Sequence, residues 1–400
     1  MNLFDRRKET MPRPELEQLQ LERLQALLVR LKRNVRRCRE KLGDLHVARL
    51  ADLAALPFTT PEEIAGSFPY GMFALPLREV IRLHSTVGPG GKPMVIGHTR
   101  NDLTQWGRLV ARQLVSSGVT ANDVVQISLG GGNDPGAAGY VLGAELIEAS
   151  VIAEDPYHVD YQAAMLQNYR PTILITTPTN AQDLMRTIDQ RRIDPQSLHL
   201  RTVLLSRPVD KETREQLAAG LFTAVRCNFG LGEILDPGLC VECEVGLFHV
   251  HEDQFLAEVC DGELVITTLA REAMPLLRYR TRVAAELCHD KCPCGRTGVL
   301  LQPGPRLDRR YRVKETMFYE AQVAEVLAQT RAAGARFQLE ASERRLVVAI
   351  EISEALFAGA ISPPQDPRRE IESELLARLG VEAEVRWTEP QPPLTPPAKP

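Results

Sequence analysis

A glycine-rich stretch, Ser85-Thr-Val-Gly-Pro-Gly-Gly-Lys-Pro93, contains the residue types that can hold a phosphate group. It lies between a partly apolar run, 79–83, and a second one, 94–97, which predicts a strand, a glycine turn and a strand. Backbone N–H groups in such a turn can surround an anion, and Lys92 can add a mobile positive charge. The stretch differs from the GxxxxGK[ST] motif because Pro93 stands where a magnesium-binding hydroxyl would be. The sequence therefore leaves two interpretations, a loop for a nucleotide triphosphate or adenylate and a plain hairpin turn.

A second constellation consists of cysteines and one histidine. Cys243 and His249 are followed, about forty-five residues later, by Cys292-Pro-Cys294-Gly. Three thiolates and an imidazole are four soft ligands that suit tetrahedral zinc, and a site with four protein ligands would be structural. The alternative is a set of buried free thiols in a reducing compartment. Three further residues are alternative ligands: Cys240, Cys288 and His251.

Size and charge restrict the classes of protein to consider. A chain of 400 residues exceeds the usual size of one core, which favours a large domain and a smaller one. The net charge of −4 argues against a nucleic-acid partner. No apolar run approaches the ~20 residues that span a bilayer, and the first residues lack the apolar core of a signal peptide. We therefore expect a cytoplasmic protein without a membrane partner.

Helical and strand patterns alternate from about residue 95 to 270, which predicts an α/β fold with parallel, helix-covered sheets. Between 240 and 287 strands follow one another without helices, so a smaller antiparallel sheet is expected there. Residues 15–40 show leucines at helical spacing and predict one amphipathic helix. The expected alternating segments are the helices 103–117, 137–148, 161–168 and 180–190 and the strands 124–129, 150–153, 172–176 and 202–205.

The pattern changes after Pro303-Gly-Pro305, where a small α+β lid is expected. The sequence thus predicts a large domain over residues 1–304 and a lid over 305–400 that ends in a proline-rich tail. The expected elements of the lid are the helices 318–330 and 368–379 and the strands 336–339, 346–352 and 383–386.

Several segments, in one unbroken order from about residue 30 to 330, resemble the phenylacetate–CoA ligase family of AMP-forming acid–thiol ligases. The resemblance implies ATP, Mg²⁺ and coenzyme A as cofactors and co-substrates, a small carboxylic acid with an apolar or aromatic side chain as substrate, and by analogy a homodimer. Some of these ligases carry a Cys/His cluster at the same places, which supports structural Zn²⁺. The matching segments include 53–60, 68–74, the glycine-rich loop with 96–103, 139–145, 176–179, 229–233, 262–269 and 275–282.

The resemblance also assigns roles to single residues. Phe229 takes the place of the aromatic residue that stacks on adenine, next to Gly230, and Glu233 takes the place of the carboxylate that holds Mg²⁺. Asp308 falls at the hinge where the lid turns and is also implied to bind the nucleotide. The residues implied to act in catalysis are Lys92, Glu233, Arg280 and, in the tail, Lys399; those implied to bind the nucleotide in the loop are Thr86, Gly88, Gly91 and Lys92.

The chain departs from the family pattern in its phosphate loop, where Val87, Pro89 and Gly90 replace hydroxyl residues. At ~1.5–3 kcal/mol for each charge-assisted hydrogen bond, three such losses would weaken phosphate binding by several powers of ten unless other groups substitute. Val283 stands where the family has an aspartate that binds the ribose hydroxyls. Two hypotheses follow, an active ligase and a catalytically degenerate relative that binds a nucleotide, an acyl-adenylate or a protein partner without turnover.

Overall fold

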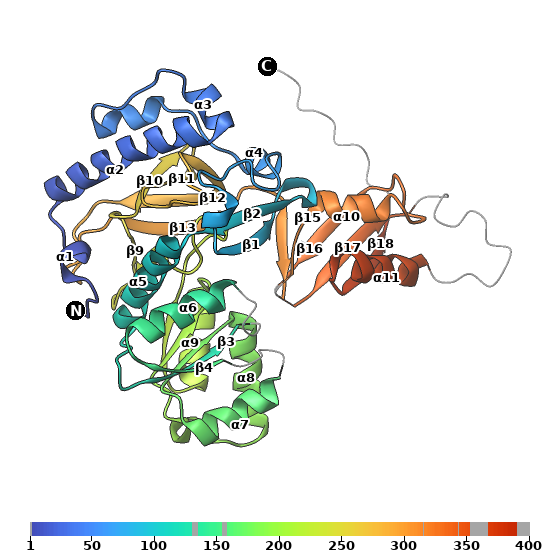
Figure 1. Cartoon of the computed structure of the whole chain (residues 1–400). Coiled ribbons are helices and arrows are strands. Elements are labelled where there is room, and N and C mark those ends of the chain that lie inside the picture. Colours follow the sequence, from blue (N-terminus) through green and yellow to red (C-terminus); the bar gives the residue numbers. More distant parts are fainter. Residues whose placement is uncertain are drawn as a thin grey trace, which may run out of the picture. The chain divides into compact units, whose positions relative to one another are not determined.

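The computed structural model describes residues 2–129, 135–153, 158–314, 316–342, 344–352 and 367–389, which fall into two compact units (Figure 1). Unit 1 contains the described residues up to Thr86 and from Pro93 to Leu307. Unit 2 contains Val87–Lys92 and the described residues from Asp308 onward. Each unit has a hydrophobic core of its own.

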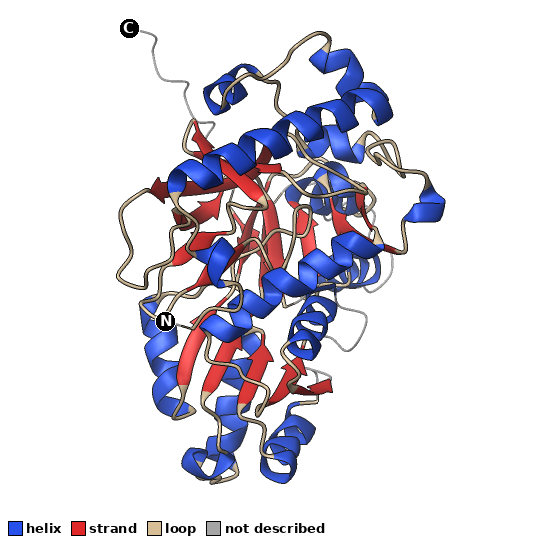
Figure 2. Ribbon diagram, turned by 60° about the vertical axis from the view of Figure 1, so that its left-hand side comes forward, coloured by secondary structure: helices blue, strands red, loops and turns tan. Residues whose placement is uncertain are grey.

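A five-stranded parallel sheet in unit 1 has the strand order β4-β3-β5-β6-β7. Since crossovers between parallel strands are right-handed, this order places α6 on one face of the sheet and α7, α8 and α9 on the other. Figure 2 shows helices, in blue, around the strands, in red. The predicted α/β alternation is confirmed. The strands are β3 (Val124–Ser128), β4 (Ser150–Ala153), β5 (Ile173–Thr176), β6 (Thr202–Leu205) and β7 (Ala224–Cys227). The helices are α5 (Arg100–Ser116), α6 (Pro135–Leu146), α7 (Val159–Tyr169), α8 (Pro178–Gln190) and α9 (Lys211–Gly220).

An antiparallel sheet of six strands, in the order β10-β11-β12-β13-β9-β8, completes unit 1. The antiparallel sheet expected between 240 and 287 is confirmed, but it also takes in β13 and, with six strands, is larger than the five-stranded parallel sheet. Every residue of β11 is buried, which shows that both faces of this strand are covered. The strands are β8 (Cys240–Glu242), β9 (Phe248–Val250), β10 (Phe255–Cys260), β11 (Glu263–Thr268), β12 (Tyr279–Cys288) and β13 (Leu300–Arg306).

The N-terminal region differs from its prediction. Two helices, α2 (Arg13–Asn34) and α3 (Arg36–Leu42), replace the single helix expected over 15–40. Val35 separates them in an extended conformation, with φ −110° and ψ 106°, and its side chain is buried. Arg39 donates to the carbonyls of Lys32 and Arg33, which satisfies acceptors that the end of α2 leaves open. Among the described residues, no helix is both long enough and apolar enough to cross a membrane.

Unit 2 is an α+β structure in which β17 pairs with β16 antiparallel and with β18 parallel. The predicted helices and strands of this region are present, and the hairpin β14–β15 adds a pair that the sequence pattern did not predict. The division of the chain at 304 and 305 stays a prediction. The elements are β14 (Arg310–Val313), β15 (Thr316–Tyr319), α10 (Glu320–Leu327), β16 (Phe337–Ala341), β17 (Leu346–Glu351), α11 (Pro367–Leu379) and β18 (Ala383–Thr388).

Helices α5 and α6 pack closely through two glycines of α6. A β-carbon at Gly139 would lie 2.7 Å from the ring of Trp106, and one at Gly143 would lie 2.6 Å from Val110. Trp106 is almost fully buried, and its Nε1–H donates to the carbonyl of Pro237 at 2.6 Å. The absence of a side chain at these two glycines therefore sets the distance between α5 and α6.

We expect Gly139→Ala to lower the free energy of unfolding by about 1–3 kcal/mol, because the added methyl group must displace the Trp106 ring. Chemical denaturation measures the loss. Glu145→Ala, at an exposed position of the same helix, serves as the control and should change stability by less than about 0.5 kcal/mol. Equal stabilities of the two variants would show that the contact is not tight in solution.

Candidate functional site

The glycine-rich stretch forms a turn between β1 (Arg82–Val87) and β2 (Pro93–His98), as the sequence predicts. Gly90 and Gly91 have φ values of +65° and +72°, which favour glycine. A β-carbon at Gly91 would meet the side chain of Gln322 at 2.7 Å. The N–H groups of Gly88 and Gly91 donate to the carbonyls of Lys92 and Gly88. Two loop amides are therefore already bonded within the turn, while the side chain of Lys92 is exposed.

The residues from 228 to 237, after β7, form a second irregular segment that is largely buried. Leu231 and Leu235 are bridged, and the N–H of Ile234 donates to the carbonyl of Leu231 at 2.9 Å, so residues 231–235 form a tight turn. Glu233 lies within this turn and is only 5% exposed. Phe229 is also buried, and its ring tilts against that of Phe248.

Contacts within unit 1 bring part of the predicted nucleotide site together. A β-carbon at Gly232 would lie 3.7 Å from the side chain of Thr86. The segment that carries Phe229, Gly230 and Glu233 therefore contacts the end of the strand that leads into the glycine turn. Gly230 is needed for the path of this segment, because a β-carbon there would lie 2.5 Å from the Asp236 carboxylate.

Other predicted residues occupy different surroundings. Arg280, on β12, forms ion pairs with Asp261 at 2.8 Å and with Glu263 at 3.3 Å. Its guanidinium also lies 4.5 Å from the centre of the Phe58 ring. Arg280 therefore pairs with acidic neighbours on an interior strand, because β12 lies between β11 and β13 in the sheet.

Val283 is buried on the same strand, opposite Arg306. Asp308 opens the second part of unit 2 and accepts a hydrogen bond from the hydroxyl of Tyr319. Lys399 lies outside the described residues, as do residues 130–134.

Two histidines beside the Glu233 turn were not singled out from the sequence. His84 Nε2 lies 3.3 Å from the carbonyl oxygen of Gly232, and His98 Nε2 lies 3.2 Å from His84 Nδ1. The ring of His98 stacks on that of Trp106. Burial lowers the pKa of His84 to about 4, with a further decrease from the nearby charge of Arg271, and burial also lowers the pKa of His98. His84 stands two residues before Thr86 on β1, and residues two apart on a strand point to the same face. This spacing was the signal in the sequence that His84 lies on the same side as Thr86.

The cysteine and histidine constellation comes together in unit 1. Ligand atoms of Cys243, His249, Cys292 and Cys294 all lie within 4.8 Å of one another, and all four residues are buried. Cys243 Sγ is 3.9 Å from Cys292 Sγ, and Cys294 Sγ is 3.3 Å from His249 Nε2. Zinc–sulfur bonds of ~2.3 Å at tetrahedral angles place sulfurs ~3.8 Å apart, so the observed spacing could hold a metal ion.

Groups around the cluster also fit a metal. His249 Nδ1 lies 2.9 Å from the Gly298 carbonyl, which directs Nε2 toward the thiols. Burial and the neighbouring thiols raise the pKa of Cys292 to about 12, so a cation would be needed to stabilise its thiolate at neutral pH. The three alternatives lie outside the cluster: Cys240, Cys288 and His251.

The loop that carries Cys292 and Cys294 also binds the N-terminal segment. Arg296 donates to Glu9 Oε2 at 3.1 Å and to the carbonyl of Asn2 at 2.6 Å. Both charged side chains of the Arg296–Glu9 pair are buried. The geometry of the cluster loop and the position of the N-terminal residues are therefore linked.

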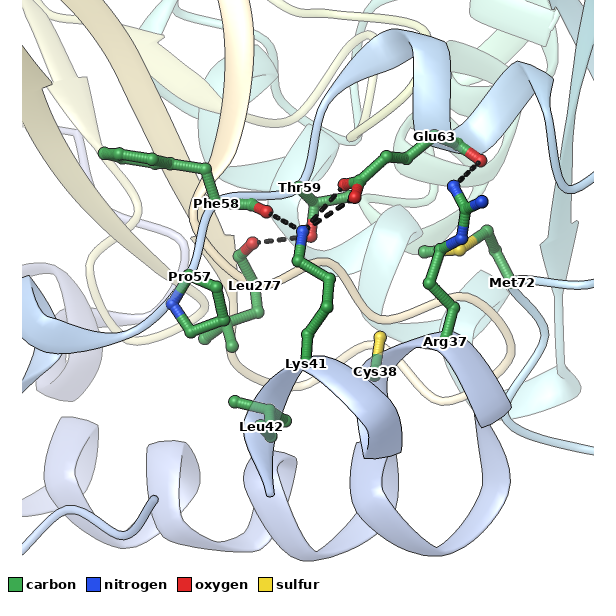
Figure 3. Close-up of a pocket in the computed structure, with 10 residues that line it drawn as sticks. All are labelled: Arg37, Cys38, Lys41, Leu42, Pro57, Phe58, Thr59, Glu63, Met72 and Leu277. Atoms are coloured by element: carbon green, nitrogen blue, oxygen red, sulfur yellow. Dashed lines mark hydrogen bonds and ion pairs between the residues drawn. The ribbon is translucent and has the colours of Figure 1, made fainter. Parts of the chain in front are cut away.

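A small pocket between α3 and residues 57–63 is lined by Lys41, whose Nζ donates to Glu63 and to the Phe58 carbonyl (Figure 3). Its free volume of about 10 Å³ is close to that of one water molecule. Cys38 also lines this pocket, and burial raises the pKa of its thiol to about 11. With a free volume of about 10 Å³, the pocket is too small for a substrate.

We expect acid to destabilise the protein through the neutral histidines beside the Glu233 turn. In the unfolded chain the two histidines bind protons near pH 6.5, their ordinary pKa. In the folded state, burial keeps His84 and His98 neutral well below that pH. Each such histidine lowers the free energy of unfolding by up to about 1.4 kcal/mol for each pH unit below 6.5. Chemical denaturation at pH 7, 6 and 5 should show that wild type loses stability faster than His84→Gln. A constant difference between the two proteins would contradict a neutral His84.

Comparisons with known proteins place the chain among CoA ligases. No family model matches the chain. The phenylacetate–coenzyme A ligase of Thermus thermophilus is 34% identical over 403 residues, which cover 94% of this chain and 88% of that protein. The phenylacetate–coenzyme A ligase of Pseudomonas putida is 35% identical over 295 residues, covering 68% of this chain and 67% of that protein.

Among solved structures, 2-hydroxyisobutyryl-CoA ligase in complex with 2-HIB-AMP and CoA matches with a TM-score of 0.87. The match covers 100% of this chain and 91% of that one at 21% identity, which shows a shared fold. The fold class and family expected from the sequence are thereby confirmed: the chain belongs to the phenylacetate–CoA ligase family.

Proposed function

We propose that this protein is an AMP-forming acid–thiol ligase that activates a small, aromatic carboxylic acid and transfers it to coenzyme A. Membership of the phenylacetate–CoA ligase family carries this proposal. In the first step a carboxylate oxygen of the acid attacks the α-phosphorus of ATP, and pyrophosphate leaves. In the second step the thiol sulfur of coenzyme A attacks the acyl carbon, and AMP leaves. We also propose that the protein forms a homodimer and that it is located in the cytoplasm.

The chain's own residues would contribute binding and charge control. Phe229 would stack on adenine beside Gly230, and Glu233 would hold Mg²⁺, which neutralises phosphate charge when bound. Thr86, Gly88, Gly91 and Lys92 would contact the phosphates. Arg280 would lie near the nucleotide, Asp308 would serve as the hinge of a lid over residues 305–400, and Lys399 would act in adenylation.

A second candidate function is a degenerate ligase that binds a nucleotide, an acyl-adenylate or a partner protein without turnover. The phosphate loop favours this candidate, since Pro89 offers no N–H and the Gly88 N–H is already bonded to the Lys92 carbonyl. Val283 also favours it, because a buried valine cannot accept hydrogen bonds from ribose hydroxyls.

For the four buried ligands we propose a structural zinc ion. Four protein ligands leave no coordination position for substrate, so the ion would hold the turn after β8, strand β9 and the 292–298 loop together. Through Arg296, this loop also holds the N-terminal segment.

We expect the purified protein to contain about one zinc ion per chain, and Cys292→Ser to lose it, because a tetrahedral site rarely tolerates the loss of a thiolate. Metal analysis by mass spectrometry measures the content. Limited proteolysis should then cut the variant near residues 2–12, since the loop that binds Glu9 loses its support.

Cys288→Ser is the matched control, because Cys288 is exposed and lies outside the cluster. It should keep its zinc and its resistance to protease. A full zinc content in Cys292→Ser would refute the proposed ligand set.

The central test of the function is ATP–pyrophosphate exchange with a panel of aryl and short-chain carboxylic acids. Exchange with one or more acids would establish adenylation and name the substrate class. Glu233→Gln should lower the exchange rate at least about 100-fold, because loss of a magnesium ligand removes several kcal/mol of stabilisation.

Glu145→Gln, an exposed substitution, is the control and should exchange at the wild-type rate. An unchanged rate in Glu233→Gln would refute the role of Glu233. No exchange in wild type, together with no ATP binding by calorimetry, would favour the degenerate ligase.

A further inference from the structure

Three backbone carbonyls in the segment around Glu233 are bonded by side chains that lie far away in the sequence. His84 contacts the Gly232 carbonyl at 3.3 Å, and Arg271 Nη1 donates to the Ile234 carbonyl at 3.1 Å. Trp106 donates to the Pro237 carbonyl, further along the same segment. The first two contacts flank Glu233 in the sequence, one residue on each side.

The contact at Gly232 fixes the proton positions of both histidines. A carbonyl oxygen can only accept, so His84 Nε2 must carry the proton that it donates to Gly232. Because burial keeps His84 neutral, its Nδ1 carries no second proton and accepts, so the proton between the two rings belongs to His98 Nε2. Both imidazoles are neutral in this arrangement, in agreement with their burial.

Arg271 makes the matching contact on the other side of Glu233. Its guanidinium is buried, and Nη2 donates to the carbonyl of Gly97, next to His98 on β2. One imidazole thus joins the Glu233 turn to β1, and one guanidinium joins it to β2. These are the two strands that lead into and out of the glycine-rich turn.

We propose that His84 and Arg271 are positioning residues that hold the Glu233 carboxylate in place for the metal ion of the bound nucleotide. The inference rests on the proposed function, in which Glu233 binds that ion. Mg²⁺ requires near-ideal geometry with oxygen ligands at 2.0–2.1 Å, so small rotations of this turn would weaken its binding. Displacements of about 1 Å at a reacting centre can cost about 100-fold in rate.

The test compares His84→Phe with His84→Gln. Phenylalanine keeps a ring beside His98 but cannot donate, whereas the glutamine amide can donate to the Gly232 carbonyl. We measure the Mg²⁺ concentration that gives half-maximal ATP–pyrophosphate exchange, together with the midpoint of thermal unfolding. His84→Phe should raise this concentration about tenfold, the effect of one lost hydrogen bond, and His84→Gln should restore it to within about threefold of wild type.

Trp106→Phe is the control for a purely structural effect, because it removes a buried hydrogen bond to the same segment four residues away from Glu233. It should lower the unfolding midpoint and leave the Mg²⁺ dependence unchanged. If His84→Phe does not fold, His84→Asn takes its place, since its shorter amide does not reach Gly232. A long-range ¹H–¹⁵N spectrum of wild type should show His84 as the neutral Nε2–H form.

The outcomes separate the two proposals. If wild type exchanges and His84→Phe has the wild-type Mg²⁺ dependence, or if Trp106→Phe shifts it equally, the positioning role is overturned while the ligase activity stands. A neutral Nδ1–H form of His84 would also overturn the positioning role. If wild type exchanges with no acid at any Mg²⁺ concentration, the proposed function fails, and the positioning role fails with it.

Discussion

A buried segment without regular secondary structure must still find hydrogen-bond partners for its backbone carbonyls, and in residues 228–237 side chains donate to three of them. The donors come from β1, from α5 and from the loop between β11 and β12. Each donor must stay at bonding distance, so the elements that supply them are fixed relative to the end of β7. The close packing of α5 on α6 also contributes, because it holds Trp106 at hydrogen-bonding distance from the Pro237 carbonyl of this segment.

Buried charges impose a similar constraint elsewhere in unit 1. Arg112 and Asp253 form an ion pair at 2.7 Å in which both side chains are 2% exposed. Arg296 and Glu9 form a second buried pair. Removal of one partner from such a pair leaves an uncompensated charge, which costs several kcal/mol. Helix α5 is therefore held to Asp253, and the N-terminal residues are held to the Cys/His loop, although the partners of each pair lie far apart in the sequence.

Local patterns were sufficient to predict most of the fold. Alternating strand and helix segments identified the parallel sheet. Ligand chemistry together with the family resemblance selected Cys243, His249, Cys292 and Cys294, while other cysteines and one histidine stayed open as alternatives. The break at Val35 was not predictable, because its extended conformation depends on burial in the tertiary core. His84 and Arg271 were also missed, since their partners lie 148 and 37 residues away and the only local signal was the alternation of His84 with Thr86 along β1. The role of Arg280 stays a prediction, because arginines on a strand pair with neighbouring acids as readily as with phosphates.

The close approach of Gly91 to Gln322 has a consequence for the folding of unit 2. The amide oxygen of Gln322 accepts the backbone N–H of Tyr319, which caps the first turn of α10. The same side chain fills the space that a β-carbon at residue 91 would need. A methyl group added to the glycine-rich turn would therefore compete with a helix cap. The first turn of α10 is therefore capped beside a turn that lies far earlier in the sequence, so the space around this helix end depends on a long-range contact.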